Sequence, residues 1–372
     1  MKVFQTAHTF APFTNYLEQK YHISERDYSF AELQSIVIDE GFNAVHHLLP
    51  ILNGDKENGF YTLWNYEPMQ RRWAKENGCR ETDLKAIQRA QIEAFGPDVL
   101  YTLSPIQYTP EEIRALPEKM IKLSWFASPE KNNIDFSAYH ARLTNLPTDV
   151  GTENGFRSIF FQLSDAPVFH PFSDHTHRPI DVLFFGQYMK DHFDKRNGYI
   201  HELIRLQEKH GFNLMLALMT NYEYEHLLPF KLPYALHEKF KVLRFPPKQV
   251  AEKAHAPLFG TSMLRTIGQA KIVFNCHVDI AGEHRVNMRI FEALGCGAHM
   301  LSDEGIYPDG LIPGTHFTTY KNIGDLEAKI LHLLANDKER TTIAKEGTTA
   351  IRALYSKEQQ WQQFQKIAAS FS

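Results

Sequence analysis

The chain has 372 residues, which argues for two domains, and its 43% hydrophobic residues supply enough apolar side chains for two cores. Charged residues make up 23% and leave a formal net charge of −4, so no basic excess points to a nucleic-acid partner. The three cysteines, Cys79, Cys276 and Cys296, are too few and too widely spaced for a disulfide framework or a zinc site, which fits a reducing cytosol.

The first half of the chain predicts strands that alternate with helices. Strands are expected at residues 2–7, 43–50, 98–103 and 119–128, and helices at 14–21, 64–78 and 81–96. Such alternation is typical of α/β units around a parallel sheet. Residues 144–179 are rich in Pro, Ser, Thr, Asp and His, and we interpret them as the passage between two domains.

The second half repeats the α/β pattern. Strands are expected at 180–188, 213–219, 241–247, 270–278 and 298–303, and helices at 198–211, 325–337, 338–347 and 356–370. The sequence therefore predicts a second parallel sheet. No apolar run reaches the roughly 18 residues that span a bilayer, and the N-terminus lacks the apolar core of a signal peptide. We expect a cytoplasmic protein, with peripheral membrane contact left open.

The stretch "EHRVNMRIFEAL", residues 283–294, carries an unusual density of charge between two apolar segments. If it is one helix that stops at Gly295, then Arg285, Arg289 and Glu292 lie within about 60° of arc, beside an apolar stripe. Helix N-termini that follow parallel strands attract phosphate, and the arginine fork can bind its oxygens. A carboxylate there can accept hydrogen bonds from ribose. This favours a nucleotide-diphosphate site, although Arg289 and Glu292 could equally form a surface pair.

From about Arg178 onward the sequence resembles nucleotide-sugar glycosyltransferases of the GT-B class, in the group 1 branch that includes spore-maturation-type enzymes. The segments that carry the resemblance are "RPIDVLFFGQY", "AKIVFNCHV", "HRVNMRIFEALGCGAHMLSD", residues 314–347 and the closing helix. The resemblance implies an α/β fold with two Rossmann-like domains that face each other across a cleft. Residues 1–165 would bind the acceptor, residues 178–355 the nucleotide sugar, and the helix within 356–372 would pack back toward the first domain.

The resemblance also implies roles for particular residues. Glu292 matches the glutamate that such enzymes use on the donor ribose, and Gly186 matches the glycine where the backbone approaches the donor phosphates. The other expected donor-binding residues are Arg196, His277, Arg285, Asn287 and Arg289. A second glutamate eight positions before Glu292 is absent, because His284 stands there and Glu283 one place earlier. Glu283 and His284 are therefore candidate catalytic residues, and the stereochemical outcome stays open.

A further catalytic candidate is His8, which follows the first strand and could serve as the base that an inverting enzyme needs. The chain contains no Asp-x-Asp motif, so we expect no metal or other cofactor, with positive side chains stabilising the departing diphosphate. The expected partners are a nucleotide sugar and a saccharide, lipid-linked or protein acceptor. Two alternatives remain: a sugar-nucleotide epimerase or hydrolase on this scaffold, and a non-catalytic bilobal protein that binds a small ligand. Nucleotide base, sugar, acceptor and oligomeric state are not predicted.

Overall fold

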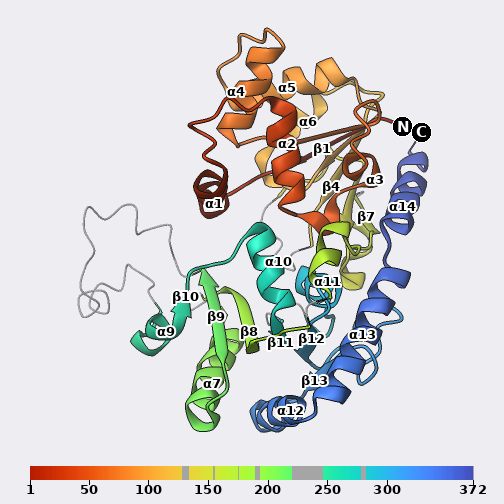
Figure 1. Cartoon of the computed structure of the whole chain (residues 1–372). Coiled ribbons are helices and arrows are strands. Elements are labelled where there is room, and N and C mark those ends of the chain that lie inside the picture. The colour runs from red at the N-terminus through yellow and green to blue at the C-terminus, as the bar shows by residue number, and fades with distance from the viewer. Residues whose placement is uncertain are drawn as a thin grey trace. The chain divides into compact units, whose positions relative to one another are not determined.

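The computed structural model describes residues 1–127, 134–153, 156–174, 176–188, 193–219, 246–277 and 282–371. These residues form two compact units (Figure 1): unit 1 comprises Met1–Val168 and Tyr355–Ser372, and unit 2 comprises Phe169–Leu354. Each unit is built around a largely parallel sheet, so the predicted α/β class is confirmed. The acceptor and donor roles expected for the two halves of the chain stay predictions.

The sheet of unit 1 has seven strands in the order β2-β1-β3-β4-β5-β7-β6, all parallel except β6, which runs antiparallel to β7. Their bounds are β1 Val3–Ala7, β2 Gly59–Leu63, β3 Val99–Thr102, β4 Ile121–Trp125, β5 Ala141–Thr144, β6 Gly151–Glu153 and β7 Phe156–Phe160. Every residue of β1 is buried, as expected for a central parallel strand covered on both faces.

One prediction for this unit was wrong, and the predicted passage between domains contains the boundary between the units, at Val168 and Phe169, but also part of the sheet. Residues 43–50, expected as a strand, instead form a 3-10 turn at Ala44–His46 and the start of α3, Leu49–Leu52. Asn43 adopts a left-handed conformation, and a proline occupies the first turn of α3, so local geometry interrupts the extended chain. Residues 144–179, expected as the passage between domains, supply β6 and β7 to the sheet.

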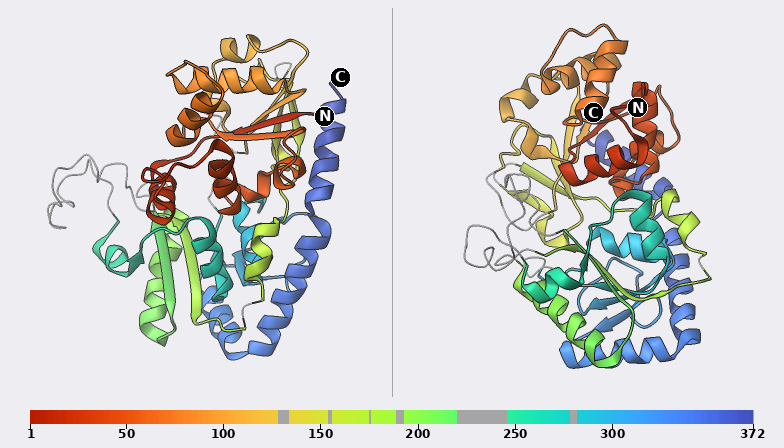
Figure 2. Two further views of the ribbon diagram at one scale, coloured as in Figure 1. Left: turned by 45° about the horizontal axis from the view of Figure 1, so that its top comes forward. Right: turned by 60° about the vertical axis from the view of Figure 1, so that its left-hand side comes forward.

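Seven helices described for unit 1 surround its sheet. They are α1 Ala11–Tyr21, α2 Phe30–Asp39, α3, α4 Glu67–Glu76, α5 Leu84–Phe95, α6 Pro110–Arg114 and α14 Lys357–Ala369. The last of these comes from the C-terminus and lies beside the strands of unit 1, as predicted (Figure 2). Phe364, Ile367 and Ala368 pack in the same core as Val3 and Tyr101.

The entry into α14 is tied down by a buried lysine. The Nζ of Lys357 donates to the carbonyl oxygens of Ala44, at 2.6 Å, and His47, at 2.9 Å. Burial lowers the pKa of this ammonium group to about 7. The C-terminal helix is therefore held to unit 1 by polar contacts at its start and by apolar packing along its length.

The sheet of unit 2 has six parallel strands in the order β10-β9-β8-β11-β12-β13. The bounds are β8 Ile180–Gln187, β9 Leu214–Met219, β10 Ala254–His255, β11 Ala270–Asn275, β12 His299–Asp303 and β13 Thr318–Tyr320. The described helices are α7 Asp194–His210, α9 Lys248–Lys253, α10 Gly260–Gly268, α11 Met288–Gly295, α12 Ile323–Ala335 and α13 Asp337–Leu354. The strand expected at 241–247 falls mainly outside the described residues.

The strand order of unit 2 identifies where a ligand would bind. From β8 the chain moves outward to β9 on one side, and β11 then pairs with the other side of β8. In open parallel sheets, ligands bind beyond the carboxyl ends of the strands at such a reversal. The residues to inspect are therefore those that follow β8, β11 and β12.

Candidate donor-nucleotide site

The structure changes the start of the helix on which the sequence-based site depended. Helix α11 begins at Met288, not at Glu283, and the preceding residue, Asn287, is extended with φ −73° and ψ 157°. His284 pairs instead with Ile306 in an isolated parallel bridge. Residues 283–287 therefore form a separate strand-like segment, and Arg285 does not share a helical edge with the charged residues of α11.

Arg289, in the first turn of α11, reaches back to the end of β8. Its Nη2 donates to the carbonyl oxygen of Phe185, and its Nη1 donates to Oδ1 of Asn275 at 3.1 Å. The guanidinium also lies 4.7 Å from the ring centroid of Phe185, and burial lowers its pKa to about 10. A Cβ atom on Gly186 would meet Nη2 at 2.8 Å. Arg289 thus braces the end of β8 and requires a glycine beside it.

Glu292 lies one turn further along α11 and is partly exposed. No hydrogen bond or ion pair of its carboxylate is found among the described residues. Burial raises its pKa to about 7, although the nearby charge of Arg289 lowers it. A carboxylate that is costly to ionise and lacks a protein partner is suited to binding a ligand, since hydroxyl groups of the ligand would replace the hydrogen bonds to water that the carboxylate loses on burial.

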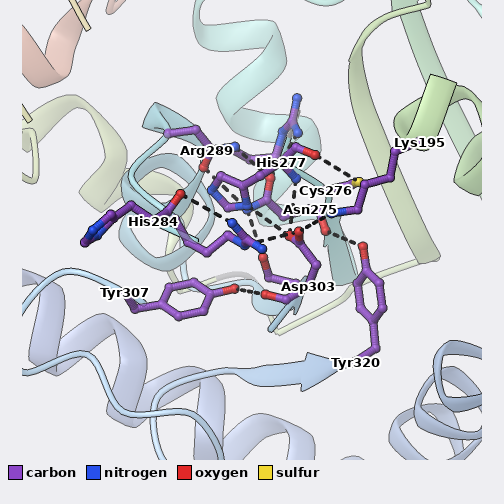
Figure 3. A network of polar contacts seen from close by, with 12 residues as sticks. Lys195, Asn275, Cys276, His277, His284, Arg289, Asp303, Tyr307 and Tyr320 are labelled. Carbon is purple, nitrogen blue, oxygen red and sulfur yellow. Dashed lines mark hydrogen bonds and ion pairs between the residues drawn. The ribbon is translucent and has the colours of Figure 1, made fainter. Parts of the chain in front are cut away.

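A buried carboxylate at the end of β12 collects three other side chains (Figure 3). One oxygen of Asp303 lies 2.9 Å from Nδ1 of His277, and the other lies 3.1 Å from Nε of Arg285 and 3.2 Å from Nζ of Lys195. These partners come from the end of β11, the segment before α11 and the first turn of α7. Burial opposes ionisation of Asp303, yet His277, Arg285 and Lys195 hold its pKa below the ordinary value.

The neighbouring residue of α7 is Arg196, whose guanidinium is at most partly satisfied by hydrogen bonds within the described part of the chain. Its Nε has no hydrogen-bond partner among the described residues, and its guanidinium lies 4.6 Å from the ring centroid of Phe193. Burial lowers its pKa, and its charge in turn lowers the pKa of Arg289, so the two guanidinium groups lie near each other. An anion between them would relieve this repulsion.

Asn287, predicted on the donor side, is joined to the end of β11 by an amide pair. Its Nδ2 donates to Oδ1 of Asn275 at 2.9 Å, while Nδ2 of Asn275 donates to Oγ of Ser302 at 3.1 Å. Because Asn275 also accepts from Arg289, one side chain joins β11, β12 and α11. The structure therefore brings Gly186, Arg196, His277, Arg285, Asn287, Arg289 and Glu292 to one edge of the unit 2 sheet.

Comparison with known proteins gives this arrangement a class. A family model described as glycosyl transferase-like matches residues 227–366. HepE of Anabaena, solved with UDP, is 11% identical, covers 100% of both chains and superposes with a TM-score of 0.56. The match covers 140 of the 372 residues, and the structural likeness shows that the chain has a GT-B fold.

Two further solved structures share this fold. An alpha-glucosyltransferase complexed with UDP and DNA is 10% identical, with 99% of this chain and 100% of that chain covered and a TM-score of 0.56. TarM of S. aureus is 11% identical with a TM-score of 0.52, and 77% of this chain matches 59% of TarM. The chain thus spans about three-fifths of TarM. None of the curated protein sequences matches it.

The candidate catalytic residues belong to both units: His8 lies in unit 1, and Glu283 and His284 lie in unit 2. The side chain of Glu283 is exposed, and the ring of His284 points away from the network around Asp303 (Figure 3). His8 follows β1 in unit 1 and is exposed, and partial burial lowers its pKa. Within unit 2, the side chains of Glu283 and His284 therefore take no part in the network around Asp303, and the catalytic role of all three residues remains a prediction.

Two residues of the candidate donor-nucleotide site, Lys195 and Asp303, were not predicted from the sequence. Lys195 precedes Arg196, and Asp303 ends a predicted strand, so position at a strand or helix end was the available signal. Among the described residues, no three His, Cys, Asp or Glu side chains form a group that could hold a metal ion. Within those same ranges, every helix is too short or too polar to cross a bilayer.

Proposed function

We propose that this protein is a glycosyltransferase that moves a hexosyl group from a nucleoside-diphosphate sugar, with a uridine nucleotide as the first choice, to a saccharide, lipid-linked or protein acceptor. The solved structures of HepE, TarM and the alpha-glucosyltransferase contain UDP, and one HepE structure contains UDP-glucose. The alpha-glucosyltransferase complex also contains DNA. The acidic net charge of the present chain favours a non-nucleic-acid acceptor here.

The observation that supports the proposal is the balance of charge at the carboxyl ends of β8, β11 and β12. Four basic side chains face two acidic ones there, the basic ones being Lys195, Arg196, Arg285 and Arg289 and the acidic ones Asp303 and Glu292. With both carboxyls ionised, the excess of two positive charges matches the two charges of a bridging diphosphate. An anion bound there would offset the mutual repulsion of the basic side chains.

Different residues of the cluster have different roles in this proposal. Arg196, with an unpartnered Nε, and Lys195, about one-third exposed, would contact the diphosphate directly. Arg289 would act indirectly, because its guanidinium holds the backbone of Phe185 where the chain leaves β8. Glu292 would accept hydrogen bonds from the ribose hydroxyls.

The proposed reaction breaks the bond between the sugar and the diphosphate, so negative charge develops on the departing phosphate. Preorganised cations stabilise that charge more in the transition state than in the ground state. This would replace a divalent metal, and we therefore propose metal-independent transfer. His8, Glu283 and His284 remain the candidates for activating the acceptor or contacting the transferred sugar.

A thermal-shift screen against UDP, GDP, dTDP, ADP and CMP tests the donor class. A nucleotide at 100 times its Kd stabilises the folded state by about 2.7 kcal/mol, which raises Tm by roughly 5–11 °C in a domain of this size, at about 2–4 °C per kcal/mol. We expect one nucleoside diphosphate to produce the shift. Arg196→Ala should abolish it, whereas His210→Gln, on the opposite end of α7, should keep it. Wild-type protein that responds to none of the five would refute the donor assignment.

Transfer itself is tested by product analysis with the stabilising nucleotide's hexose conjugate, with and without oligosaccharide acceptors. We expect a new glycoside only when an acceptor is present, at an undiminished rate in excess EDTA. A new sugar nucleotide formed without acceptor would instead identify an epimerase. Activity lost in EDTA and restored by Mg²⁺ or Mn²⁺ would contradict the metal-independent mechanism.

A further inference from the structure

Of the contacts that the Asp303 carboxylate makes with basic side chains, the one with His277 is the most completely enclosed. The two side chains are 6% and 3% exposed. Oδ1 of Asp303 accepts from the backbone N–H of His277 at 3.2 Å and lies 2.9 Å from its Nδ1. The strand register explains the meeting, because Asn275 of β11 is paired with Ser302 of β12. Asp303 directly follows Ser302, and His277 lies two residues after Asn275, so both residues lie just beyond the last paired position of the two strands.

The partners of Asp303 determine which nitrogen of His277 carries the proton. With Arg285 and Lys195 on its other oxygen, Asp303 is ionised and can only accept hydrogen bonds. Nδ1 of His277 must then be the donor. Burial lowers the pKa of His277, although Asp303 opposes that shift, so the ring is neutral near pH 7. The remaining nitrogen, Nε2, consequently has a lone pair and no hydrogen.

Nε2 of His277 is buried without a hydrogen-bond partner among the described residues. The adjacent ring of Tyr307 lies edge-on at 6.4 Å, and its hydroxyl is already committed to the carbonyl oxygen of Asp303. A buried acceptor left unpaired is unfavourable, because it has lost its hydrogen bonds to water. Only a donor can remove that cost, so a phosphate oxygen is excluded and a hydroxyl group is suitable.

We propose that His277 recognises a hydroxyl group of the sugar nucleotide through Nε2, with Asp303 as the positioning residue that keeps the proton on Nδ1. This inference rests on the proposed donor function and assigns one recognition element within it. It separates the role of His277 from that of Lys195 and Arg196, which would contact the diphosphate. Since Nε2 is covered, the hydroxyl must displace the atoms above it, which makes the contact selective for a ligand that supplies a donor.

The hydroxyl can belong to the hexose or to the ribose, and titration calorimetry with three probes distinguishes these sources. UDP-glucose carries both sugars, UDP carries only ribose, and inorganic pyrophosphate carries neither. His277→Phe keeps the ring and removes the acceptor, and His277→Gln restores an acceptor near the position of Nε2. His210→Gln is the matched control on α7.

We expect His277→Phe to bind UDP-glucose about tenfold more weakly than wild type, with affinity partly restored in His277→Gln. Unchanged UDP binding assigns the hydroxyl to the hexose, and an equal loss for UDP assigns it to ribose. Pyrophosphate affinity should stay within about twofold of wild type. Equal loss for pyrophosphate, or no loss for any probe, would overturn the inference. If wild-type protein binds neither nucleotide, the proposed function itself fails, which is a separate result.

The role of Asp303 is tested in wild-type protein, because Asp303→Asn removes a charge between two cations and can fail to fold. Long-range ¹H–¹⁵N spectra of histidine-labelled protein distinguish the two ring tautomers, and His277→Phe identifies the signal by its disappearance. We expect the Nδ1–H form at pH 7.5. A ring that carries its proton on Nε2, or a doubly protonated ring, would refute the positioning role.

Discussion

The carboxyl of Glu292 gives the sharpest prediction about stability, because its ionisation is costly in the folded protein. The change to test is Glu292→Gln, which keeps the shape of the side chain and removes its charge. Burial raises the pKa of Glu292 from 4.5 to about 7, against the opposing effect of Arg289. The folded protein therefore holds this proton more tightly than the unfolded chain does.

The sign and size of the effect follow from that difference. The stabilisation provided by the neutral carboxyl is complete below pH 4.5 and is lost as the pH rises through 7. The difference between a pKa of 4.5 and one of about 7, at about 1.4 kcal/mol per pKa unit, amounts to about 3.5 kcal/mol in full, of which about 3 kcal/mol develops between pH 4.5 and pH 8. Relative to wild type, Glu292→Gln should therefore gain about 3 kcal/mol in free energy of unfolding between pH 4.5 and pH 8.

The assay is denaturant unfolding of both proteins at pH 4.5, 5.5, 6.5, 7.5 and 8.5, with the transition of unit 2 followed separately because the two units can unfold independently. Glu346→Gln, at an exposed position of α13, controls for the chemical change. A wild-type-to-variant difference that is flat across this range would refute the buried-carboxyl argument. At pH 8 the variant should also bind UDP about tenfold more weakly, in keeping with a ligand-binding residue that costs stability.

Two other predictions concern single residues. Gly186→Ala should weaken UDP binding at least tenfold, because the new Cβ would lie 2.8 Å from Nη2 of Arg289. The control is Gly198→Ala in α7, whose new Cβ would meet no atom within 4 Å, so this variant should be neutral or stabilising. Unchanged UDP binding in Gly186→Ala would contradict the close approach of Arg289 to Gly186. The free energy of unfolding of the wild type should rise between pH 7 and pH 10, since the folded-state pKa of Lys357 is lowered to about 7. Lys357→Met should lack this rise, and Lys366→Met, at an exposed position, should keep it. Chemical denaturation across this pH range would measure the difference.

The sequence predicted the class of the fold and which residues of α11 are buried, because both depend on the spacing of apolar residues over short stretches of chain. Ile290, Ala293 and Leu294 are buried along one side of that helix, as their spacing predicted, and Glu292 lies at its edge. The start of the helix was misplaced because non-local contacts decide it. Asn287 is held by Asn275 of β11, and His284 pairs with Ile306, which lies beyond β12. Neither partner is visible in a helical projection of residues 283–294.

The network around Asp303 was missed for a related reason. Lys195, His277 and Asp303 are separated along the chain, and each alone reads as a polar residue at the end of a helix or strand. Only the register of β11 against β12 brings His277 and Asp303 together. A prediction of that pair requires the order of strands in the sheet as well as their positions in the sequence.

The contacts of Arg289 change which variant can test diphosphate binding. Its guanidinium is committed to Phe185 and Asn275, so Arg289→Ala would leave a buried carbonyl unpaired and open space beside Gly186. Loss of nucleotide binding in that variant would not separate a missing phosphate contact from a displaced β8 end. Arg196 has no such commitment at Nε, so its removal perturbs the ligand more than the scaffold. Arg196→Ala is therefore the variant that tests the proposed diphosphate contact, whereas Arg289→Ala tests how far nucleotide binding depends on the backbone that Arg289 braces.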